Sequence, residues 1–369
     1  MLKRFSVENF KNFEKKVILD LASPANYTFG KSLIKDNCIT KAMIYGINSS
    51  GKSNLGLALL DIVCHLTDKQ KLQNSYKNYS NMNNTDTVVS FEYVFEFDGV
   101  EVIYRYGKTQ VMDLEYEHLL INNEEMIYYD RSKQKAYTKL KGSETLNSAI
   151  SSNNPISRVR YVNANAILEK TQENLAFKSF MDFVDRMLLF YSLDRRGYQG
   201  FQTGGGSIAE GIIKSGKLKD FESFLNENGI FYKLEAGQTN GEDTIYCKFK
   251  NSSADFFQIA STGTNSLALL YYWYINMEQA SLVFMDEFDA FYHFELARSI
   301  VKRVLQLSDT QIILTTHNTD LISNDILRPD CYFQLKDGNL RVFSECTDKE
   351  LRQAHNLQKM YKAGAFDRK

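Results

Sequence analysis

A glycine-rich segment near the amino terminus constrains the fold of this chain more than any other feature. The segment reads Gly46-Ile47-Asn48-Ser49-Ser50-Gly51-Lys52-Ser53 and fits the phosphate-loop pattern G-x-x-x-x-G-K-S/T at every position. Residues 42–45 before it predict a short buried strand, and residues 54–60 after it predict a helix. Together, a strand, a tight turn and a helix amino terminus direct backbone N–H groups and the helix dipole toward an anion. The segment therefore predicts an α/β fold with a nucleotide-phosphate site.

The residue types in this loop assign roles at the phosphate site. Lys52 is expected to neutralise the β- and γ-phosphate oxygens, and Ser53 to place its hydroxyl on Mg²⁺. We expect further residues of the loop and the first helical turn to contact the nucleotide, which we take to be ATP. These are Gly46, Asn48, Ser49, Gly51 and Asn54. The alternative is a glycine-rich turn before an ordinary helix.

An apolar run that ends in two acids supplies the second motif. Residues 283–287 read Val-Phe-Met-Asp-Glu, the pattern of a buried parallel strand whose carboxyl end meets the nucleotide. Asp286 would hold Mg²⁺ through water, and Glu287 would polarise the attacking water. The alternative is a core strand with a solvated acidic turn. The motif lies more than 200 residues after the phosphate loop, a gap too long for a compact GTPase-like domain.

Two further segments stand near this second motif. Residues 311–317 form another buried-strand pattern that ends in His317, which can reach a γ-phosphate as a sensor or can be a loop histidine without a role. Residues 261–264 read Ser-Thr-Gly-Thr and precede an apolar helix pattern. Ser261 and Gly263 are the candidate binding residues there, and a simple hydroxyl-capped helix start is the alternative.

Composition places the chain among cytoplasmic globular proteins. Its 369 residues suffice for one large or two ordinary domains, and a net charge of −1 gives no overall basic field for nucleic acid. A local basic groove could still bind DNA. The five cysteines lack metal-site spacing and indicate reduced thiols, and no apolar run approaches the length that spans a membrane, so no membrane partner is expected.

The rest of the chain predicts a series of secondary elements. An aromatic hairpin turns at Asp98-Gly99, and a second hairpin turns at Asn240-Gly241. Residues 175–193 and 214–225 predict helices, residues 69–85 predict an exposed connection, and residues 133–154 predict a loop or a short helix. Three further features are a glycine tip at 204–206, an edge hairpin at 331–343, and a tail at 349–369 that docks on the head or on another protein.

The order of these motifs resembles the ABC-type ATPase heads of the SMC, RecF and OLD group. The order is phosphate loop, long insertion, Ser-x-Gly-Thr before a helix, apolar-Asp-Glu, then Thr-Thr-His. Residues 5–13 are similar to the first strand and "NF-x-x-F" turn of that group. The segments "INSSGKSNL", "DEFDAFYH" and "TTHNTDLI" are most similar to compact OLD-like bacterial ATPases, many of them from phage-defence operons, with the RloA and AbiL types as examples.

This resemblance implies an architecture. The expected fold is an ABC-type ATPase head with a mostly parallel sheet carrying the phosphate loop, an adjoining antiparallel sheet and a helical insertion. The expected divisions are an N-terminal ATPase lobe at 1–130, an inserted helical lobe at 131–244 and a C-terminal ATPase lobe with tail at 245–369. The lack of sustained heptads argues against a long coiled-coil arm.

The resemblance also implies a working unit. Two chains would form a head-to-tail homodimer, or a higher homo-oligomer, around ATP and Mg²⁺. Ser261 and Gly263 of one subunit would close over the γ-phosphate held by the other, and His317 would sense that phosphate. The transporter signature SGGQ is not present, since Thr262 and Thr264 stand in place of one of its glycines and its Gln, which argues against a transporter subunit.

Some positions of the family pattern have no single match. Asp289 lies where the D-loop should be, and His293 occupies a position common after the Asp-Glu pair in OLD-like proteins. Either could instead be an ordinary turn residue. The Q-loop glutamine is unassigned among Gln110, Gln172, Gln199 and Gln202.

The expected function is slow ATP hydrolysis that regulates a separate effector protein, such as a nuclease or toxin, in anti-phage defence. We expect no nuclease activity in this chain, because some fifty residues after His317 are too few for a further nuclease domain. The alternatives are a RecF/SMC-like ATPase that binds DNA ends in repair, and a scaffold that uses ATP without turnover.

Overall fold

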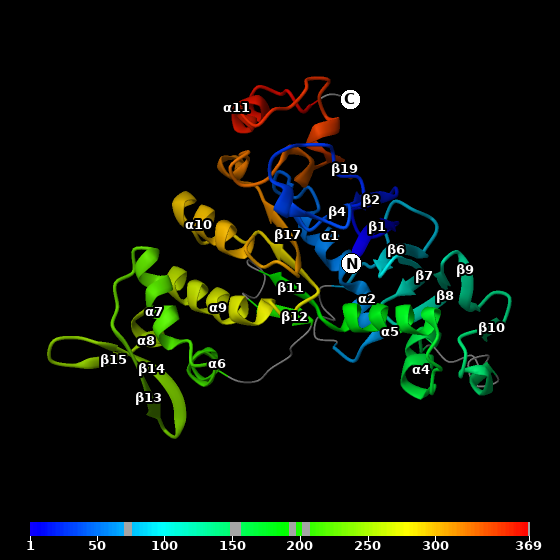
Figure 1. Cartoon of the computed structure of the whole chain (residues 1–369), viewed down its shortest axis with the longest axis horizontal. Helices are drawn as coiled ribbons and strands as arrows, with labels where there is room; N and C mark the ends of the chain where they lie inside the picture. Colours follow the sequence, from blue (N-terminus) through cyan, green and yellow to red (C-terminus); the bar gives the residue numbers. More distant parts are fainter. Residues whose placement is uncertain (70–75, 148–155, 192–196, 201–206, 368–369) are drawn as a thin grey trace.

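The computed structural model describes residues 1–69, 76–147, 156–191, 197–200 and 207–367. Within these residues, two seven-stranded sheets form the body of the molecule (Figure 1). The core sheet has the order β12-β11-β16-β17-β5-β18-β19. Its parallel strands are β5 (Lys41–Tyr45), β11 (Met187–Tyr191), β16 (Leu282–Asp286), β17 (Gln311–Thr316) and β18 (Tyr332–Lys336), and its antiparallel edges are β12 (Gly197–Gly200) and β19 (Asn339–Val342). The predicted strands at 42–45, 283–287 and 311–317 are confirmed.

The second sheet is antiparallel and has the order β10-β9-β8-β7-β6-β1-β2. Its strands are β1 (Leu2–Glu8), β2 (Val17–Asp20), β6 (Val89–Phe97), β7 (Val100–Gln110), β8 (Asp113–Ile121), β9 (Glu124–Asp130) and β10 (Lys135–Thr138). The aromatic hairpin is confirmed as β6 and β7, joined at Asp98-Gly99. Its apolar face is core, since Phe95 packs on Phe180 and Phe183 of helix α5 (Gln172–Asp185) at 5.3 Å between ring centroids.

The helix after the phosphate loop is short and ends at Leu59. Helix α1 (Lys52–Leu59) packs on β16, where a Cβ at Gly56 would lie 2.5 Å from the Phe284 ring, so only glycine fits there. Helix α2 (Asp61–Leu66) then begins with a fully buried acid. The Asp61 carboxylate accepts hydrogen bonds from Lys108 at 2.7 Å and from Tyr79 at 2.8 Å, which ties α2 to the antiparallel sheet.

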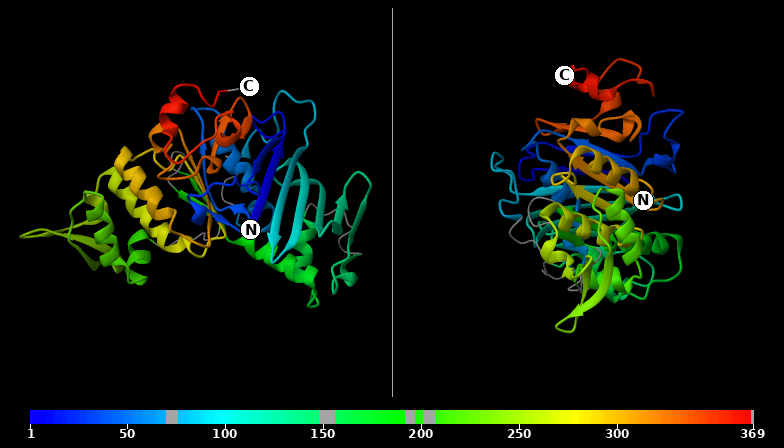
Figure 2. Two further views of the ribbon diagram at one scale, coloured as in Figure 1. Left: turned by 45° about the horizontal axis from the view of Figure 1, so that its top comes forward. Right: turned by 90° about the vertical axis from the view of Figure 1, so that its left-hand side faces the viewer.

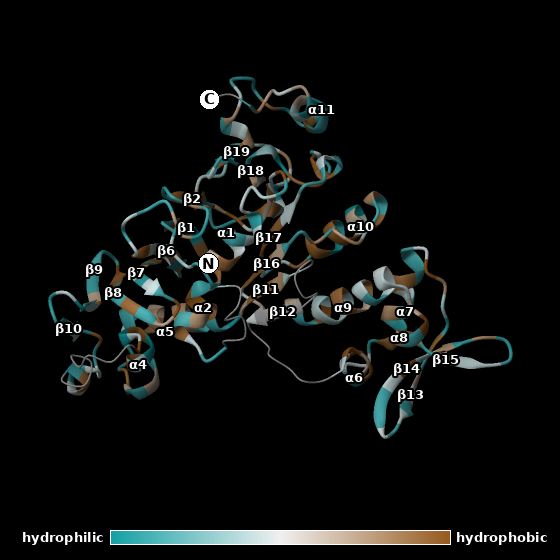
Figure 3. Cartoon of the chain, turned by 180° about the vertical axis from the view of Figure 1, so that it is seen from behind, coloured by the Kyte–Doolittle hydropathy of each residue, from teal (hydrophilic) through white to brown (hydrophobic). Residues whose placement is uncertain are grey.

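A separate lobe carries most of the remaining helices. Figures 1 and 2 show it projecting from one side of the core sheet. It contains α6 (Ile208–Lys214), α7 (Leu218–Glu227), α8 (Phe256–Ile259), α9 (Thr262–Met277) and the sheet of β13 (Leu234–Thr239), β14 (Glu242–Lys248) and β15 (Ser253–Asp255), with α10 (Phe294–Val304) beside α9. The hairpin at Asn240-Gly241 is confirmed as β13 and β14. Figure 3 shows hydrophobic residues gathered on the central strands, whereas the β13–β14 hairpin is mostly hydrophilic.

Three predictions about the middle of the chain are wrong in detail. The helix predicted for 175–193 ends at Asp185, and the apolar run 187–191 is strand β11, paired in parallel with β16. A short apolar run fits a buried strand and a helix equally well by periodicity. The connection at 133–154 contains strand β10, and Tyr76 and Tyr79 of the connection at 69–85 are buried. The glycine tip at 204–206 lies outside the described residues.

The carboxyl-terminal tail folds back onto its own chain. It contains α11 (Leu357–Lys362), and Leu351, Leu357 and Phe366 are all buried. The Phe366 ring stacks on Phe343 at 4.7 Å between centroids. Of the two docking places expected for the tail, the head is confirmed, because the head itself covers these apolar residues. The edge hairpin before the tail is confirmed as β18 and β19.

The remaining described elements are short. They are α4 (Arg158–Asn165), the strand pair β3 (Ile34–Lys35) and β4 (Cys38–Ile39), and the 3₁₀ helices η1 (Lys31–Leu33), η3 (Glu144–Leu146), η4 (Thr319–Leu321), η5 (Pro329–Cys331) and η6 (Phe343–Glu345). A search of the described residues for a helix both long and apolar enough to cross a bilayer finds none.

Candidate nucleotide site

The strand order brings the sequence motifs to one edge of the core sheet. Strand β17 lies between β5 and β16, and all three run in parallel. The phosphate loop follows β5, the Asp-Glu pair ends β16, and Thr-Thr-His ends β17. The carboxyl ends of parallel strands meet at the same edge, which is where open α/β sheets bind ligands. These motifs, separated by more than 200 residues in the sequence, therefore share one site.

Lys52 lies buried at the centre of this edge. Its ammonium donates to the carbonyl oxygens of Gly46 at 2.8 Å and Ile47 at 3.1 Å, and it pairs with Glu287 Oε1 at 3.2 Å. The loop thus wraps around its own lysine. The loop tip at Ile47, Asn48 and Ser49 is exposed, so its backbone is accessible to a phosphate.

Both loop glycines are required by close contacts. A Cβ at Gly46 would lie 2.4 Å from Ser50 Oγ, and one at Gly51 would lie 2.4 Å from Asn12 Nδ2. Gly51 also has φ of 106°, a left-handed conformation that side chains disfavour. Asn12 itself accepts a hydrogen bond from Asn54 Nδ2 at 2.6 Å. The sequence analysis missed Asn12 as a site residue, although it lies in the 5–13 turn.

Asp286 and Ser53 form the candidate Mg²⁺ position. The hydroxyls of Ser53 and Thr315 both hydrogen-bond to the buried Asp286 carboxylate, the latter at 2.8 Å. Burial raises the pKa of Asp286, and these hydroxyls and Lys52 oppose that rise. No cluster of three or more His, Cys, Asp or Glu side chains suited to a metal occurs in the described part of the chain. One carboxylate and one hydroxyl fit Mg²⁺ that takes its other ligands from phosphates and water.

Glu287 follows in a strained backbone conformation. Its φ is 43°, in the left-handed region, and its carboxylate faces Lys52. Its backbone N–H donates to Thr315 Oγ1 at 2.8 Å. Thr315 thus contacts both members of the acidic pair, and the sequence analysis did not identify it. The Thr-Thr pair before His317 can be read from the sequence, but the residues to which these threonines hydrogen-bond depend on the strand order.

His317 and Asp289, the candidate sensor and D-loop residues, follow strands β17 and β16 closely in the sequence. His317 is exposed at the end of β17. Thr316 Oγ1 donates to the buried Asp289 carboxylate at 2.8 Å, and burial raises the pKa of Asp289. His293 caps α10 by accepting from the Leu296 N–H.

The Ser-Thr-Gly-Thr segment at residues 261–264 lies at the start of α9, a different element from those that carry this cluster. Ser261 caps α9 by accepting from the Thr264 N–H at 3.1 Å, and it is exposed. A Cβ at Gly263 would lie 3.7 Å from the Phe291 carbonyl oxygen, ordinary van der Waals contact. Figure 1 places α9 in the projecting lobe, with β17 between that helix and α1. The structure therefore brings Lys52, Ser53, Asp286 and Glu287 together, and no hydrogen bond or ion pair among the described residues joins Ser261 or Gly263 to them.

The Q-loop glutamine stays unassigned. Gln110 ends β7 and Gln172 begins α5, and both are exposed. Gln199 lies in β12, and Gln202 lies outside the described residues.

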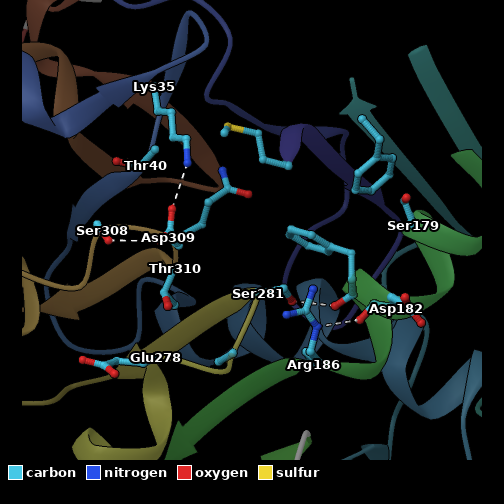
Figure 4. A pocket seen from close by; sticks show the side chains of 15 residues that line it. Lys35, Thr40, Ser179, Asp182, Arg186, Glu278, Ser281, Ser308, Asp309 and Thr310 are labelled. Atoms are coloured by element: carbon cyan, nitrogen blue, oxygen red, sulfur yellow. Dashed lines mark hydrogen bonds and ion pairs between the residues drawn. The ribbon is translucent and has the colours of Figure 1, made fainter. Parts of the chain in front are cut away.

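A cavity of about 320 Å³ lies at the opposite edge of the core sheet. Ser281 and Thr310, which line it, precede β16 and β17. Figure 4 shows Lys35 and Asp309 on one side of this cavity, where they form an ion pair of 2.9 Å. Since these are the amino ends of the strands, the cavity is separate from the nucleotide site.

Comparison with known proteins gave one family match and several similar solved structures. The protein family described as "AAA domain, putative AbiEii toxin, Type IV TA system" matches residues 41–323. Among solved structures, the chain is similar to an SMC head domain from Thermotoga maritima, with a TM-score of 0.44 and 15% identity over 92% of this chain and 97% of that chain. An SMC head from Pyrococcus furiosus with an extended coiled coil, bound to the C-terminal domain of ScpA, gives a TM-score of 0.47 and 12% identity over 92% and 95%. The comparison with curated proteins gave no match.

Proposed function

The chain belongs to the AAA-domain family whose description names the AbiEii toxin, and we propose that it binds ATP with Mg²⁺ and hydrolyses it slowly as a head-to-tail dimer. One observation carries this proposal. Lys52, Ser53, Asp286 and Glu287 lie at one sheet edge, and Lys52 and Glu287 are 3.2 Å apart. This is the set of groups that phosphoryl transfer requires: a cation, a metal position and a carboxylate for water.

The residues divide the work by chemistry. The loop N–H groups and Lys52 hold the β- and γ-phosphates, and Ser53 and Asp286 hold Mg²⁺. Mg²⁺ held by these two residues would supply positive charge to the transferring phosphoryl oxygens. The γ-phosphate competes with Glu287 for Lys52, which frees the carboxylate to orient and deprotonate water. His317, exposed directly after β17, would contact the γ-phosphate.

The placement of Ser261 and Gly263 supports the proposed dimer. Ser261 is exposed, and its hydrogen bonds among the described residues stay within the first turn of α9. The N-terminus of this 16-residue helix offers N–H groups to an anion. In a head-to-tail pair, Ser261 and Gly263 of one subunit would cover the phosphate held by the other.

The biological role we propose is regulation of a separate effector in anti-phage defence, in the manner of compact OLD-like ATPases. The family description names a toxin of a toxin–antitoxin system, which supports a role in a defence module with a second component. We propose that cleavage or killing belongs to that other polypeptide.

Nucleotide binding and assembly test this proposal together. Purified protein is titrated with Mg²⁺-ATP, and its hydrolysis and sedimentation are measured with Lys52→Ala as the reference. We expect ATP-dependent dimers and slow turnover in the wild type and neither in Lys52→Ala. Hydrolysis that is equal in both proteins would refute the assignment. A parallel series with duplex DNA ends tests the repair alternative, which strong stimulation would favour.

A further inference from the structure

Thr315 lies at the junction of the two acidic residues without touching the expected position of ATP. It is fully buried near the end of β17, between the phosphate-loop strand and β16. Its hydroxyl donates to Asp286 Oδ1 and accepts from the Glu287 N–H, both at 2.8 Å. We propose that Thr315 is a positioning residue for ATP hydrolysis, which holds Asp286 and Glu287 in their reactive geometry. This inference rests on the function proposed above.

The direction of both hydrogen bonds is fixed by chemistry. A hydroxyl has one proton and two lone pairs, and a backbone N–H can only donate. The Glu287 N–H therefore occupies a lone pair, and the single hydroxyl proton is left for Asp286. One side chain thus sets the position of the metal-binding carboxylate and of the backbone that carries the water-activating carboxylate.

The backbone at Glu287 needs such an anchor. The ladder between β16 and β17 ends at the pair of Met285 and Leu314. Beyond it the chain turns into the left-handed conformation of Glu287, with φ of 43°. A residue other than glycine is held there only when its surroundings impose it. At this point, where the strand pairing has ended, the Thr315 hydroxyl accepts the hydrogen bond of the Glu287 N–H.

The result of this anchoring is a defined direction for the Glu287 side chain. Its carboxylate reaches Lys52 at 3.2 Å and is almost wholly buried. A small rotation at Glu287 would move the carboxylate away from the γ-phosphate position. Misplacement of a reacting group by about 1 Å can cost about 100-fold in rate, although substrate binding is unchanged.

The test compares three substitutions of Thr315 with a matched substitution just before the same strand. Thr315→Val removes the hydroxyl and keeps the shape, Thr315→Ser keeps the hydroxyl, and Thr315→Cys supplies only a weak donor. The control is Thr310→Val. Thr310 is equally buried just before β17, and its hydroxyl donates to the Met277 carbonyl oxygen at 2.9 Å at the opposite edge of the sheet.

We expect Thr315→Val to lower kcat for ATP by about 10- to 100-fold with KM changed by less than about threefold. Thr315→Ser should stay within about threefold of the wild type, and Thr315→Cys should lie between them. Thr310→Val should lower the melting temperature as Thr315→Val does and leave kcat near the wild-type value. In a Glu287→Gln background, Thr315→Val should lower kcat by a smaller factor than in the wild type, because one of the two carboxylates that it positions is gone and only Asp286 is left.

Several outcomes would overturn the inference. Equal kcat in the Val variants at 315 and 310, or an equal loss in Thr315→Ser and Thr315→Val, would show that the hydroxyl does not position the acidic pair. A rise in KM with kcat unchanged would assign Thr315 to nucleotide binding. If Thr315→Val does not fold, the comparison of kcat between Thr315→Ser and Thr315→Cys tests the inference. A kcat of Thr315→Ser that is not higher than that of Thr315→Cys would then overturn it. Absence of hydrolysis in the wild type would instead refute the proposed function.

Discussion

The ion pair between Lys52 and Glu287 is central to the mechanism proposed for this site. Both side chains are buried, and an ammonium taken out of water needs a compensating charge. A γ-phosphate carries more negative charge than a carboxylate and can take over that role. The same exchange would release Glu287 to act on water, so binding and activation of the base are linked through one lysine.

Glu287→Gln should separate binding from hydrolysis. Glutamine keeps the shape but cannot accept a proton, and loss of a general base lowers the rate by about 10²- to 10⁴-fold. ATP affinity should be equal or higher, because no carboxylate competes for Lys52. Equilibrium binding and steady-state turnover measure both effects, with the exposed Glu295→Gln as control. Turnover near the wild-type rate would remove Glu287 from the mechanism.

At the scale of elements, the core strands were the most predictable part of the molecule. The runs at 42–45, 283–287 and 311–316 are apolar, short and followed by turn or polar residues, which is the pattern of buried parallel strands. The phosphate loop and the acidic pair could therefore be assigned from local sequence. Two hairpins were equally clear, because Asp-Gly and Asn-Gly turns separate alternating runs.

Elements that depend on long-range packing could not be predicted in the same way. The run at 187–191 is apolar at every position, and only its place beside β16 makes it a strand. The burial of Asp61 at the start of α2 depends on Tyr79 and Lys108, which come from distant segments. Thr315 and Asn12 were missed for the same reason. Their contacts follow from the strand order and from the fold of the 5–13 turn over the loop.

Lys41, the first residue of β5, should make the free energy of unfolding depend on pH. Burial lowers the pKa of Lys41 from 10.5 to about 8, and its ammonium donates to the Thr310 carbonyl. Between these two values the unfolded chain binds more protons than the folded one, so the free energy of unfolding rises with pH. Relative to Lys41→Met, the wild type should gain about 1 kcal/mol from pH 8 to pH 9.

Urea denaturation of both proteins across this pH range measures the difference. The Met variant lacks the titrating amine but keeps a long side chain at the same place, so other groups cancel in the comparison. Parallel stability curves for the two proteins would contradict a lowered pKa of Lys41.

At the scale of the whole molecule, segments from both ends of the chain contribute strands to the two large sheets. Strand β1 pairs with β6 in the antiparallel sheet, while β18 from the carboxyl-terminal region lies beside β5 in the core sheet. The tail closes this arrangement, since Tyr361 of α11 contacts Tyr45, the last residue before the phosphate loop, with ring centroids 4.6 Å apart. The tail is thus part of the head.

Phe366→Ala should release the tail without unfolding the head. Truncation of a fully buried Phe costs about 3–5 kcal/mol, which corresponds to at least about 100-fold faster hydrogen exchange in a locally unfolding segment. The backbone amides of α11 should show this acceleration, and those of β5 should not. The exposed Gln353→Ala is the control. Unchanged exchange in α11 would mean that the contact with Phe343 does not hold the tail.

Sharing of the site between two chains is the central claim, and mixing two inactive variants tests it most directly. Glu287→Gln loses the base of its own half-site, and Ser261→Arg blocks the signature that it offers to a partner. In a head-to-tail pair of these variants, one of the two sites combines an intact Glu287 with an intact Ser261. We predict that ATP turnover of the mixture clearly exceeds the sum of the two proteins measured alone. A mixture of Glu287→Gln with Lys52→Ala should not recover, because each site then keeps a defect. Turnover of the first mixture that stays at the level of its components would contradict a site completed by the second chain.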